Sequence, residues 1–233
     1  MLVAAMVNLA SPARASPFTV VIDPGHGGSN TGAAGRAPGR YEKQVTLGIA
    51  RALQARLERE GLRVVLTRDG DEYLTLRERA RRANAARPDC FISLHTNASP
   101  DHGRHGVETY VLERGSADVD ARRAAARGSD ALDGLLGELR QLDAHRSSML
   151  LARAVQSRLI KSAPNRDRGV KQAAYDVLDG IDAAAILVEV GFIDHPIEGV
   201  KLLDPETQDH IAAALADGIF DFVAGQRPRL AAR

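Results

Sequence analysis

The sequence lacks three features that would place it in common functional classes. One cysteine, Cys90, stands among 233 residues, which excludes an internal disulfide framework and a metal cluster built on cysteines. Charge of one sign is also missing, because 31 basic residues face 30 acidic ones, so nothing in the net charge favours nucleic acid or an anionic membrane as a partner. Cys90 lies in the apolar run CFISL, and we expect a buried, inert thiol.

Long hydrophobic runs are the third absence. The N-terminal stretch MLVAAMVNLA is too short to cross a bilayer as a helix, so we predict no transmembrane segment. It precedes ARA at 13–15, which has the small-x-small form of a signal-peptidase site, although no basic residues come before the apolar stretch. We therefore predict a signal peptide over residues 1–15, a mature chain beginning at Ser16, and export to the periplasm or the medium.

A glycine-rich turn, in VVIDPGHGGSN, follows the first strand-like run but carries no nucleotide signature. The lysine followed by serine or threonine that a P-loop requires is missing, and Asn30 stands where a dinucleotide fingerprint needs glycine. Glycines permit positive φ angles and a close approach of other atoms to the backbone. We therefore expect some group to lie close to His26, which sits among these glycines.

Strand-like runs alternate with helical periodicity along the chain. The strand-like runs cover 18–23, 62–67, 89–94, 106–112, 169–178 and 184–190. Helices are predicted over 42–60, from a capping box at Thr75 to about Arg87, and from Asp204-Pro205 onward. The order β-α-β-α-β predicts a single α/β domain around a mainly parallel sheet.

Two charged stretches of the sequence are predicted to be helical. The run RERARRANAAR at 77–87 is predicted to be the solvated face of a helix. The segment 115–145 belongs to a longer Ala- and Arg-rich stretch, and within it DALDGLLGELRQL places its leucines on one helix face. That helix either covers the sheet or regulates the active site, with Glu138 or Asp133 reaching the reacting groups; the residues alone leave both open.

Candidate functional groups follow the ends of the strand-like runs, where parallel sheets present their reactive side chains. His26 follows the first run, His95 the third, and Glu189 ends the last, while Glu42 opens the first long helix. Two histidines and a carboxylate are a common catalytic zinc set, because three protein ligands leave a fourth position for a water whose pKa falls to about 7. A second carboxylate must move a proton, and these residues do not choose between Glu42 and Glu189 for that role.

Glu189 is the least ordinary of these residues. It lies in the apolar run ILVEVGF, and an acid in such a run is rarely buried unless it is paired or bound to a metal. The alternative is a salt bridge to one of the many arginines. The remaining histidines are predicted to have ordinary surface or hydrogen-bonding roles: His102, His105, His145, His195 and His210.

Seven segments in order resemble the zinc-dependent N-acetylmuramoyl-L-alanine amidases of the amidase-3 type, which are bacterial cell-wall hydrolases. The segments are VVIDPGHGG, EKQVTLGIARAL, LTRDGDEYLTLRERARRAN, FISLHTNA, GVETYVL, RGVKQAAYDVL and ILVEVGFIDHPIE. The resemblance runs from about Phe18 to Val223 and implies a catalytic domain over 16–226, with a tail at 227–233. It implies a six-stranded mixed, mainly parallel sheet covered by helices on both faces.

The resemblance also implies an activity and a site. The reaction is hydrolysis of the amide between N-acetylmuramic acid and L-alanine of peptidoglycan, for cell-wall remodelling or daughter-cell separation. Carried over by position, the zinc ligands are His26, Glu42 and His95, and the catalytic glutamate is Glu189. Asn97 and RGVK at 168–171 match family motifs without an assigned role, and a proline usual before the last strand is absent here.

Partners and competing functions follow from the same resemblance. Peptidoglycan is the expected substrate, and an activator protein is expected if the segment 115–145 is the inserted blocking helix that some division amidases carry. A non-catalytic glycan-binding descendant is one alternative, although all four site residues are present. A zinc peptidase that cuts within the stem peptide is another, and the products of cleavage would distinguish it.

Overall fold

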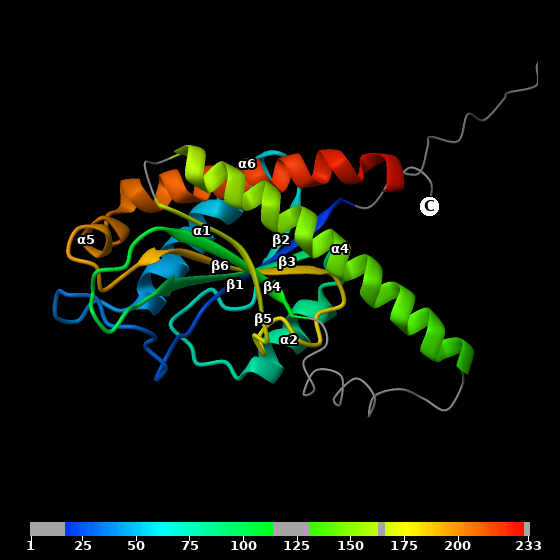
Figure 1. Ribbon diagram of the computed structural model, residues 1–233, viewed down its shortest axis with the longest axis horizontal. Helices are drawn as coiled ribbons and strands as arrows, with labels where there is room; N and C mark the ends of the chain where they lie inside the picture. The colour runs from blue at the N-terminus through cyan, green and yellow to red at the C-terminus, as the bar shows by residue number, and fades with distance from the viewer. Residues whose placement is uncertain (1–16, 114–130, 163–165, 231–233) are drawn as a thin grey trace, which may run out of the picture.

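Six strands form one sheet in this computed structural model, which describes residues 17–113, 131–162 and 166–230, with side chains except at 131–139 and 227–230 (Figure 1). The strands are β1 (Thr19–Pro24), β2 (Arg63–Leu66), β3 (Cys90–Asn97), β4 (Val107–Leu112), β5 (Asp167–Ala173) and β6 (Ala184–Phe192). They lie in the order β2-β1-β3-β6-β4-β5. Only the β4–β6 pair among them is antiparallel, so the predicted mixed, mainly parallel sheet is confirmed.

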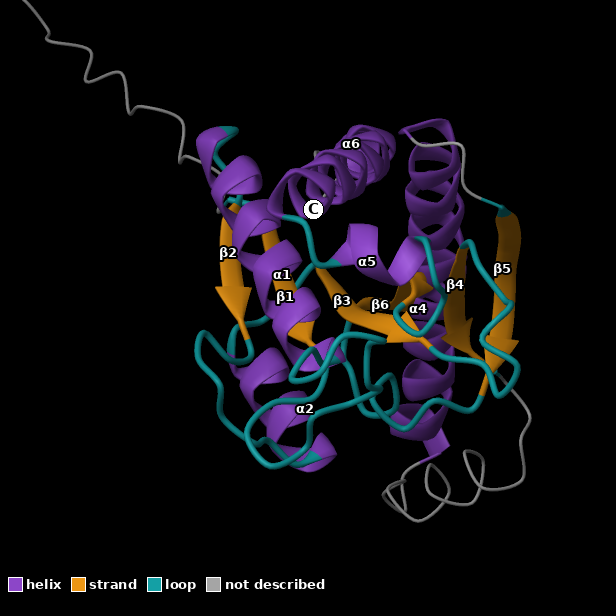
Figure 2. Ribbon diagram, turned by 90° about the vertical axis from the view of Figure 1, so that its left-hand side faces the viewer, coloured by secondary structure: helices purple, strands orange, loops and turns teal. Residues whose placement is uncertain are grey.

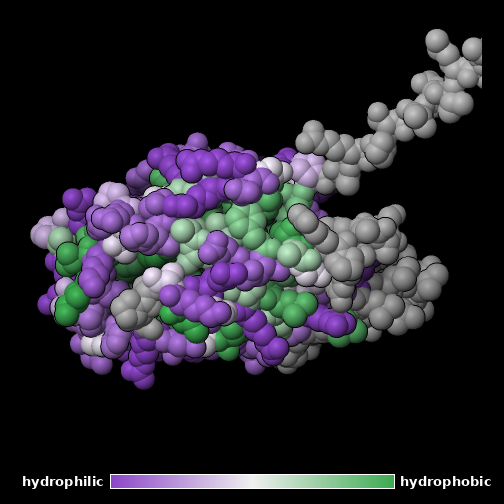
Figure 3. Space-filling model, turned by 90° about the horizontal axis from the view of Figure 1, so that it is seen from above, coloured by the Kyte–Doolittle hydropathy of each residue, from purple (hydrophilic) through white to green (hydrophobic). Residues whose placement is uncertain are grey.

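Helices cover both faces of the sheet, but unequally (Figure 2). The helices are α1 (Glu42–Arg59), α2 (Leu76–Ala85), α4 (Ala131–Ser162), α5 (Glu198–Leu202) and α6 (Pro205–Leu230). Strand side chains alternate between faces, so Ile22 packs with the larger core of α1, α4 and α6, while Val21 packs with Ala83 of α2 on the other face. Seen from above α4 and α6, the surface is largely hydrophilic, with hydrophobic residues gathered toward its middle (Figure 3).

Local sequence explains where two helices begin. The Thr75 side chain accepts a hydrogen bond from the Glu78 amide at 3.2 Å, which caps α2, but the Glu78 carboxylate pairs with Arg81 and Arg82 rather than closing the predicted capping box. At the start of α6, the Asp204 side chain accepts a hydrogen bond of 3.0 Å from the Thr207 amide. Both predicted helix starts are therefore confirmed.

The strand predicted over 169–178 is shorter than expected. It begins at Asp167 and ends at Ala173, and the chain then turns. Val177 and Leu178 join the smaller core against Leu187 of β6 instead of extending the strand. Their burial across the sheet face offsets the lost strand hydrogen bonds, which a run of apolar residues alone could not indicate.

Several predictions on the chain ends and the long insertion lie outside the described residues. The signal peptide at 1–15, residues 114–130 and the end of the tail are among them. The described part of the insertion is the long helix α4, in which Leu142 is 50% exposed, and the side chains of Asp133 and Glu138 are outside the described set. Within the described residues, no helix is both long and apolar enough to cross a membrane.

Candidate metal centre

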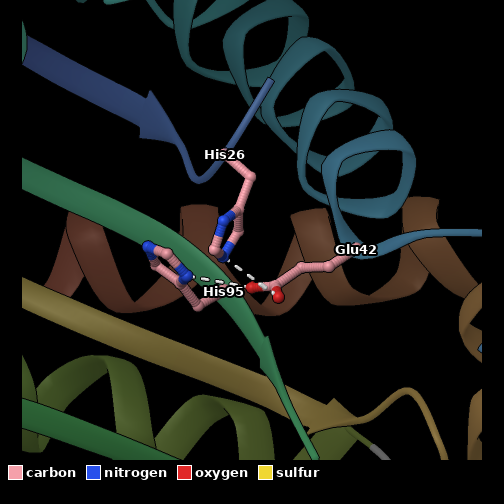
Figure 4. A group of neighbouring side chains, drawn as sticks. All are labelled: His26, Glu42 and His95. Atoms are coloured by element: carbon pink, nitrogen blue, oxygen red, sulfur yellow. Dashed lines mark hydrogen bonds and ion pairs between the residues drawn. The ribbon is translucent and has the colours of Figure 1, made fainter. Parts of the chain in front are cut away.

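Three of the predicted site residues come together at the carboxyl end of the sheet (Figure 4). His26 lies on the turn after β1, Glu42 is the first residue of α1, and His95 lies on β3. Their ligand atoms all lie within 4.8 Å of one another. Two imidazole nitrogens and a carboxylate oxygen at this spacing could hold one metal ion, and this donor set suits zinc.

The surrounding hydrogen bonds fix the orientation of all three side chains. Each Glu42 carboxylate oxygen accepts a hydrogen bond of 2.9 Å from a backbone amide, one from that of Ala33 and the other from that of Thr96. The Asn30 side-chain oxygen lies 2.9 Å from Nδ1 of His26, so Nε2 of that ring faces Glu42 at 3.1 Å. Nδ1 of His95 lies 2.9 Å from the other Glu42 oxygen. Partners of this kind hold metal ligands in place before the ion arrives.

The electrostatics favour an ionised Glu42. Burial works to raise the pKa of Glu42, but hydrogen bonds from His26 and His95 outweigh it and hold the pKa well below its usual range. Burial works in the other direction on His26, yet the bond to Glu42 raises the pKa of that imidazole. A buried carboxylate that stays charged is suited to binding a cation.

Glycines at this site make room for the ligands themselves. A Cβ on Gly25 would lie 2.5 Å from Cε1 of His95, and a Cβ on Gly32 would lie 2.6 Å from both Glu42 and His26. The sequence predicts that some group closely approaches the backbone here. The side chains of His95, Glu42 and His26 occupy that space.

Substituting Gly25 with alanine should therefore disturb the centre. We expect a loss of stability of about 1–3 kcal/mol from overpacking, and a loss of zinc affinity of at least about tenfold, because His95 must move. Gly70→Ala is the matched control, since its Cβ would meet nothing within 4 Å. Thermal unfolding and competitive zinc titration of both variants measure the two effects. Equal zinc affinity in Gly25→Ala and Gly70→Ala would contradict the geometry.

Two buried arginines hold the turn that carries His26. Arg68 donates to the carbonyls of Pro24 and Gly25 at 2.9 and 2.8 Å, and Arg79 donates to the carbonyl of His26 at 2.6 Å. His26 has a φ of 59°, a left-handed conformation that costs energy outside glycine and persists where the surroundings enforce it. Arg79 also pairs with fully buried Asp23 at 2.7 Å.

The prediction of a solvated face for 77–87 was wrong at Arg79, which is 4% exposed. Sequence reasoning missed both arginines, and it missed Arg79 because a run of charged residues in a helix is normally solvated. The available signal was weak: Arg68 follows directly after the end of a strand-like run, where functional side chains gather.

Glu189 lies beside this centre. It is the register partner of His95 on the neighbouring strand β6, so both side chains project from the same face of the sheet. Its Oε2 atom is buried and has no hydrogen-bond partner within the described part of the chain. Burial, and then the negative charges of Glu42 and Glu108, raise the pKa of Glu189 well above its usual range. Among the residues that the structure describes, Glu189 therefore has no salt bridge to an arginine.

Two of the other described histidines have ordinary hydrogen-bond partners. Nδ1 of His102 lies 2.7 Å from Asp194, and Nδ1 of His195 accepts the Glu198 amide at 3.1 Å. Cys90 is buried as predicted, and burial raises the pKa of its thiol. The chemistry therefore concentrates on His26, Glu42, His95 and Glu189.

Comparison with known proteins identifies the family of the chain. Residues 20–221 match the Amidase_3 family, N-acetylmuramoyl-L-alanine amidase. The chain is 33% identical to the amidase LytC of Bacillus subtilis over 88% of its own length, but spans 35% of that relative. It is 31% identical to the amidase AmiA of Escherichia coli K12 over 87% of its length, and spans 75% of that relative.

A solved structure extends the likeness to the fold. The catalytic domain of CwlV, an N-acetylmuramoyl-L-alanine amidase from Paenibacillus polymyxa, superposes with a TM-score of 0.72 and 27% identity, covering 89% of this chain and 98% of that domain. The match in sequence covers β1 through most of α6, and therefore all four site residues. The chain belongs to the Amidase_3 family of N-acetylmuramoyl-L-alanine amidases.

Proposed function

We propose that this chain hydrolyses the amide between the lactyl group of N-acetylmuramic acid and L-alanine in peptidoglycan, in cell-wall remodelling or daughter-cell separation. One observation supports this above the others. A His-Glu-His set that could hold a metal lies beside a buried carboxylate, one oxygen of which has no hydrogen-bond partner among the described residues, in a chain of the amidase family. Such an arrangement suits hydrolysis, because one group can take a proton while the others hold the reacting atoms.

The proposed cofactor is a single zinc ion held by His26, Glu42 and His95. Zinc at such a site polarises the carbonyl of a substrate and makes water a stronger nucleophile near neutral pH. Asn30 already orients His26, the amides of Ala33 and Thr96 orient Glu42, and Glu42 in turn contacts His95, so little rearrangement would be needed. Glu42 contributes the negative charge that offsets part of the cation's charge.

Glu189 is the proposed catalytic residue. Its Oε2 atom would accept a proton from the attacking water, and the same carboxyl group would deliver that proton to the nitrogen of L-alanine as the amide bond breaks. An acid–base residue needs a proton affinity near the working pH, and the raised pKa of Glu189 is in that direction. The buried position also keeps solvent from competing for the proton.

Mass analysis of digested peptidoglycan tests this function. Purified sacculi treated with the enzyme and zinc should release intact stem peptides that begin with L-alanine, and leave glycan strands with unsubstituted lactyl groups. Shortened stem peptides still attached to the glycan would show a peptidase instead. Binding to sacculi without any cleavage, by zinc-loaded protein, would support a glycan-binding module and contradict the proposal.

We propose further that the chain is exported to the periplasm or the medium, because its substrate lies outside the cytoplasmic membrane. The signal peptide predicted over 1–15 supports this on sequence alone. An activator protein and a blocking role for the segment 115–145 stay predictions that rest on resemblance. The residues that would test them in space lie largely outside the described set.

A further inference from the structure

A row of charged side chains crosses one face of the sheet, starting at the candidate metal centre. His95 on β3 is the register partner of Glu189 on β6, and Glu189 is the register partner of Glu108 on β4. Register partners project to the same face. Glu108 in turn pairs with Arg168 and Lys171 of β5, so the row ends in two basic side chains.

Glu108 is the buried centre of this row. The residue is 2% exposed and accepts hydrogen bonds from Asn97 at 2.6 Å, from Tyr110 at 3.0 Å and from Arg168 at 2.9 Å, and it also pairs with Lys171. Burial works to raise the pKa of Glu108, but the bonds from Lys171 and Arg168 hold it below its usual value. The hydrogen bonds and ion pairs of the Glu108 carboxylate are thus all made within the protein, and this group is not available to a ligand.

Arg168 and Lys171, unlike Glu108, keep hydrogen-bonding capacity and exposed surface that a ligand could use. Nε of Arg168 donates a hydrogen bond to Glu108. The Arg168 guanidinium carbon lies 5.0 Å from the ring centre of Phe192, and the two contacts together fix the plane of the guanidinium. Neither terminal nitrogen of Arg168 donates a hydrogen bond to another described residue. The Lys171 side chain is 37% exposed and the Arg168 side chain 18% exposed.

The charges of this group do not cancel. Arg168 and Lys171 carry two positive charges against the single negative charge of Glu108. A guanidinium held in a fixed plane with both terminal nitrogens available matches the two oxygens of a carboxylate. Glu108 therefore orients the two terminal nitrogens of the Arg168 guanidinium and keeps the Lys171 ammonium beside them.

We propose that Arg168 and Lys171 bind a carboxylate on the peptide arm of the substrate, beyond the amide that is cut. Neighbouring strands lie about 4.8 Å apart, so β5 lies roughly 10 Å from Glu189 on β6. An extended peptide advances about 3.3–3.6 Å per residue, which places the recognised carboxylate on the second or third residue of the arm. This inference rests on the proposed amidase function and names the part of the substrate that the enzyme selects.

The test uses pairs of muramoyl-peptides that differ only at the second or the third residue, as free carboxylate or as carboxamide. For one of these pairs, the wild type with zinc should have a KM at least about tenfold lower for the free acid, since the carboxamide cannot form a charge-assisted pair with the two basic side chains. Arg168→Lys keeps a positive charge beside Glu108 but lacks the two terminal guanidinium nitrogens. Lys171→Gln leaves Glu108 paired with Arg168. Both should lose most of the preference through KM for the free acid, with kcat nearly unchanged.

Arg166→Gln is the matched control, because Arg166 is an exposed arginine just before β5 and has no part in the row. It should keep the wild-type preference. A wild type without preference in either pair, or folded Arg168→Lys and Lys171→Gln variants that both retain it, would overturn the proposal. If kcat/KM of the two variants fell equally for the free acid and the carboxamide, that result would also overturn the proposal, since it indicates a structural role. Failure of the wild type to cut any muramoyl-peptide would instead count against the amidase function itself.

Discussion

Replacing Glu189 with glutamine should lower kcat by at least about a hundredfold while leaving zinc content unchanged. Glutamine has the same shape but cannot accept a proton from water at its amide group. Stability should be equal to or slightly above that of the wild type, because burial and the charges of Glu42 and Glu108 oppose an ionised carboxylate at this position. Turnover of a muramoyl-peptide, zinc per chain and thermal unfolding are the three measurements.

Glu206→Gln provides the control for this substitution, since Glu206 is exposed in the first turn of α6 and is not one of the site residues. It should retain wild-type turnover. Release of labelled fragments from sacculi by Glu189→Gln at the wild-type rate would remove Glu189 from the mechanism. Loss of zinc together with turnover would show that Glu189 supports the metal and does not act in proton transfer.

Replacing His95 with alanine should remove zinc and activity together. A structural zinc site with four ligands contributes about 10–16 kcal/mol, or about 3 kcal/mol for each ligand, so losing one should weaken binding by roughly a hundredfold or more. The wild type should hold about one zinc per chain, lose activity with a chelator and regain it with added zinc. The His95→Ala variant should show neither zinc nor recovery at the same metal concentration.

Thermal unfolding gives a readout of the metal that does not depend on turnover. Added zinc should raise the midpoint of the wild type, because an ion that binds only the folded state stabilises it, and should leave His95→Ala nearly unchanged. His210→Ala, an exposed substitution on α6, should behave as the wild type in both measurements. A zinc-dependent shift in His95→Ala as large as that of the wild type would contradict the ligand assignment.

Much of the fold could be predicted from local patterns. Apolar runs marked all six strands to within a few residues, apart from the end of β5, and Thr75 and Asp204 marked helix starts. These signals are local, because capping hydrogen bonds and the alternation of buried side chains involve neighbours in the chain. The same signals predicted that His26, His95 and Glu189 lie toward one edge of the sheet, since parallel strands share one edge, although β3 and β6 continue past His95 and Glu189 by two and three residues.

The sequence by itself therefore determined the α/β class, the strands and the residues that could carry chemistry. Only the tertiary structure decided the burial of Arg79, whose carbonyl partner on His26 lies 53 residues away, and the antiparallel pairing that sets Glu108 opposite Glu189. A charged side chain has the same local pattern whether water or a distant carbonyl accepts its hydrogen bonds. Strand direction and register likewise depend on which faces become buried against helices far along the chain, and that choice is made only when the whole core packs.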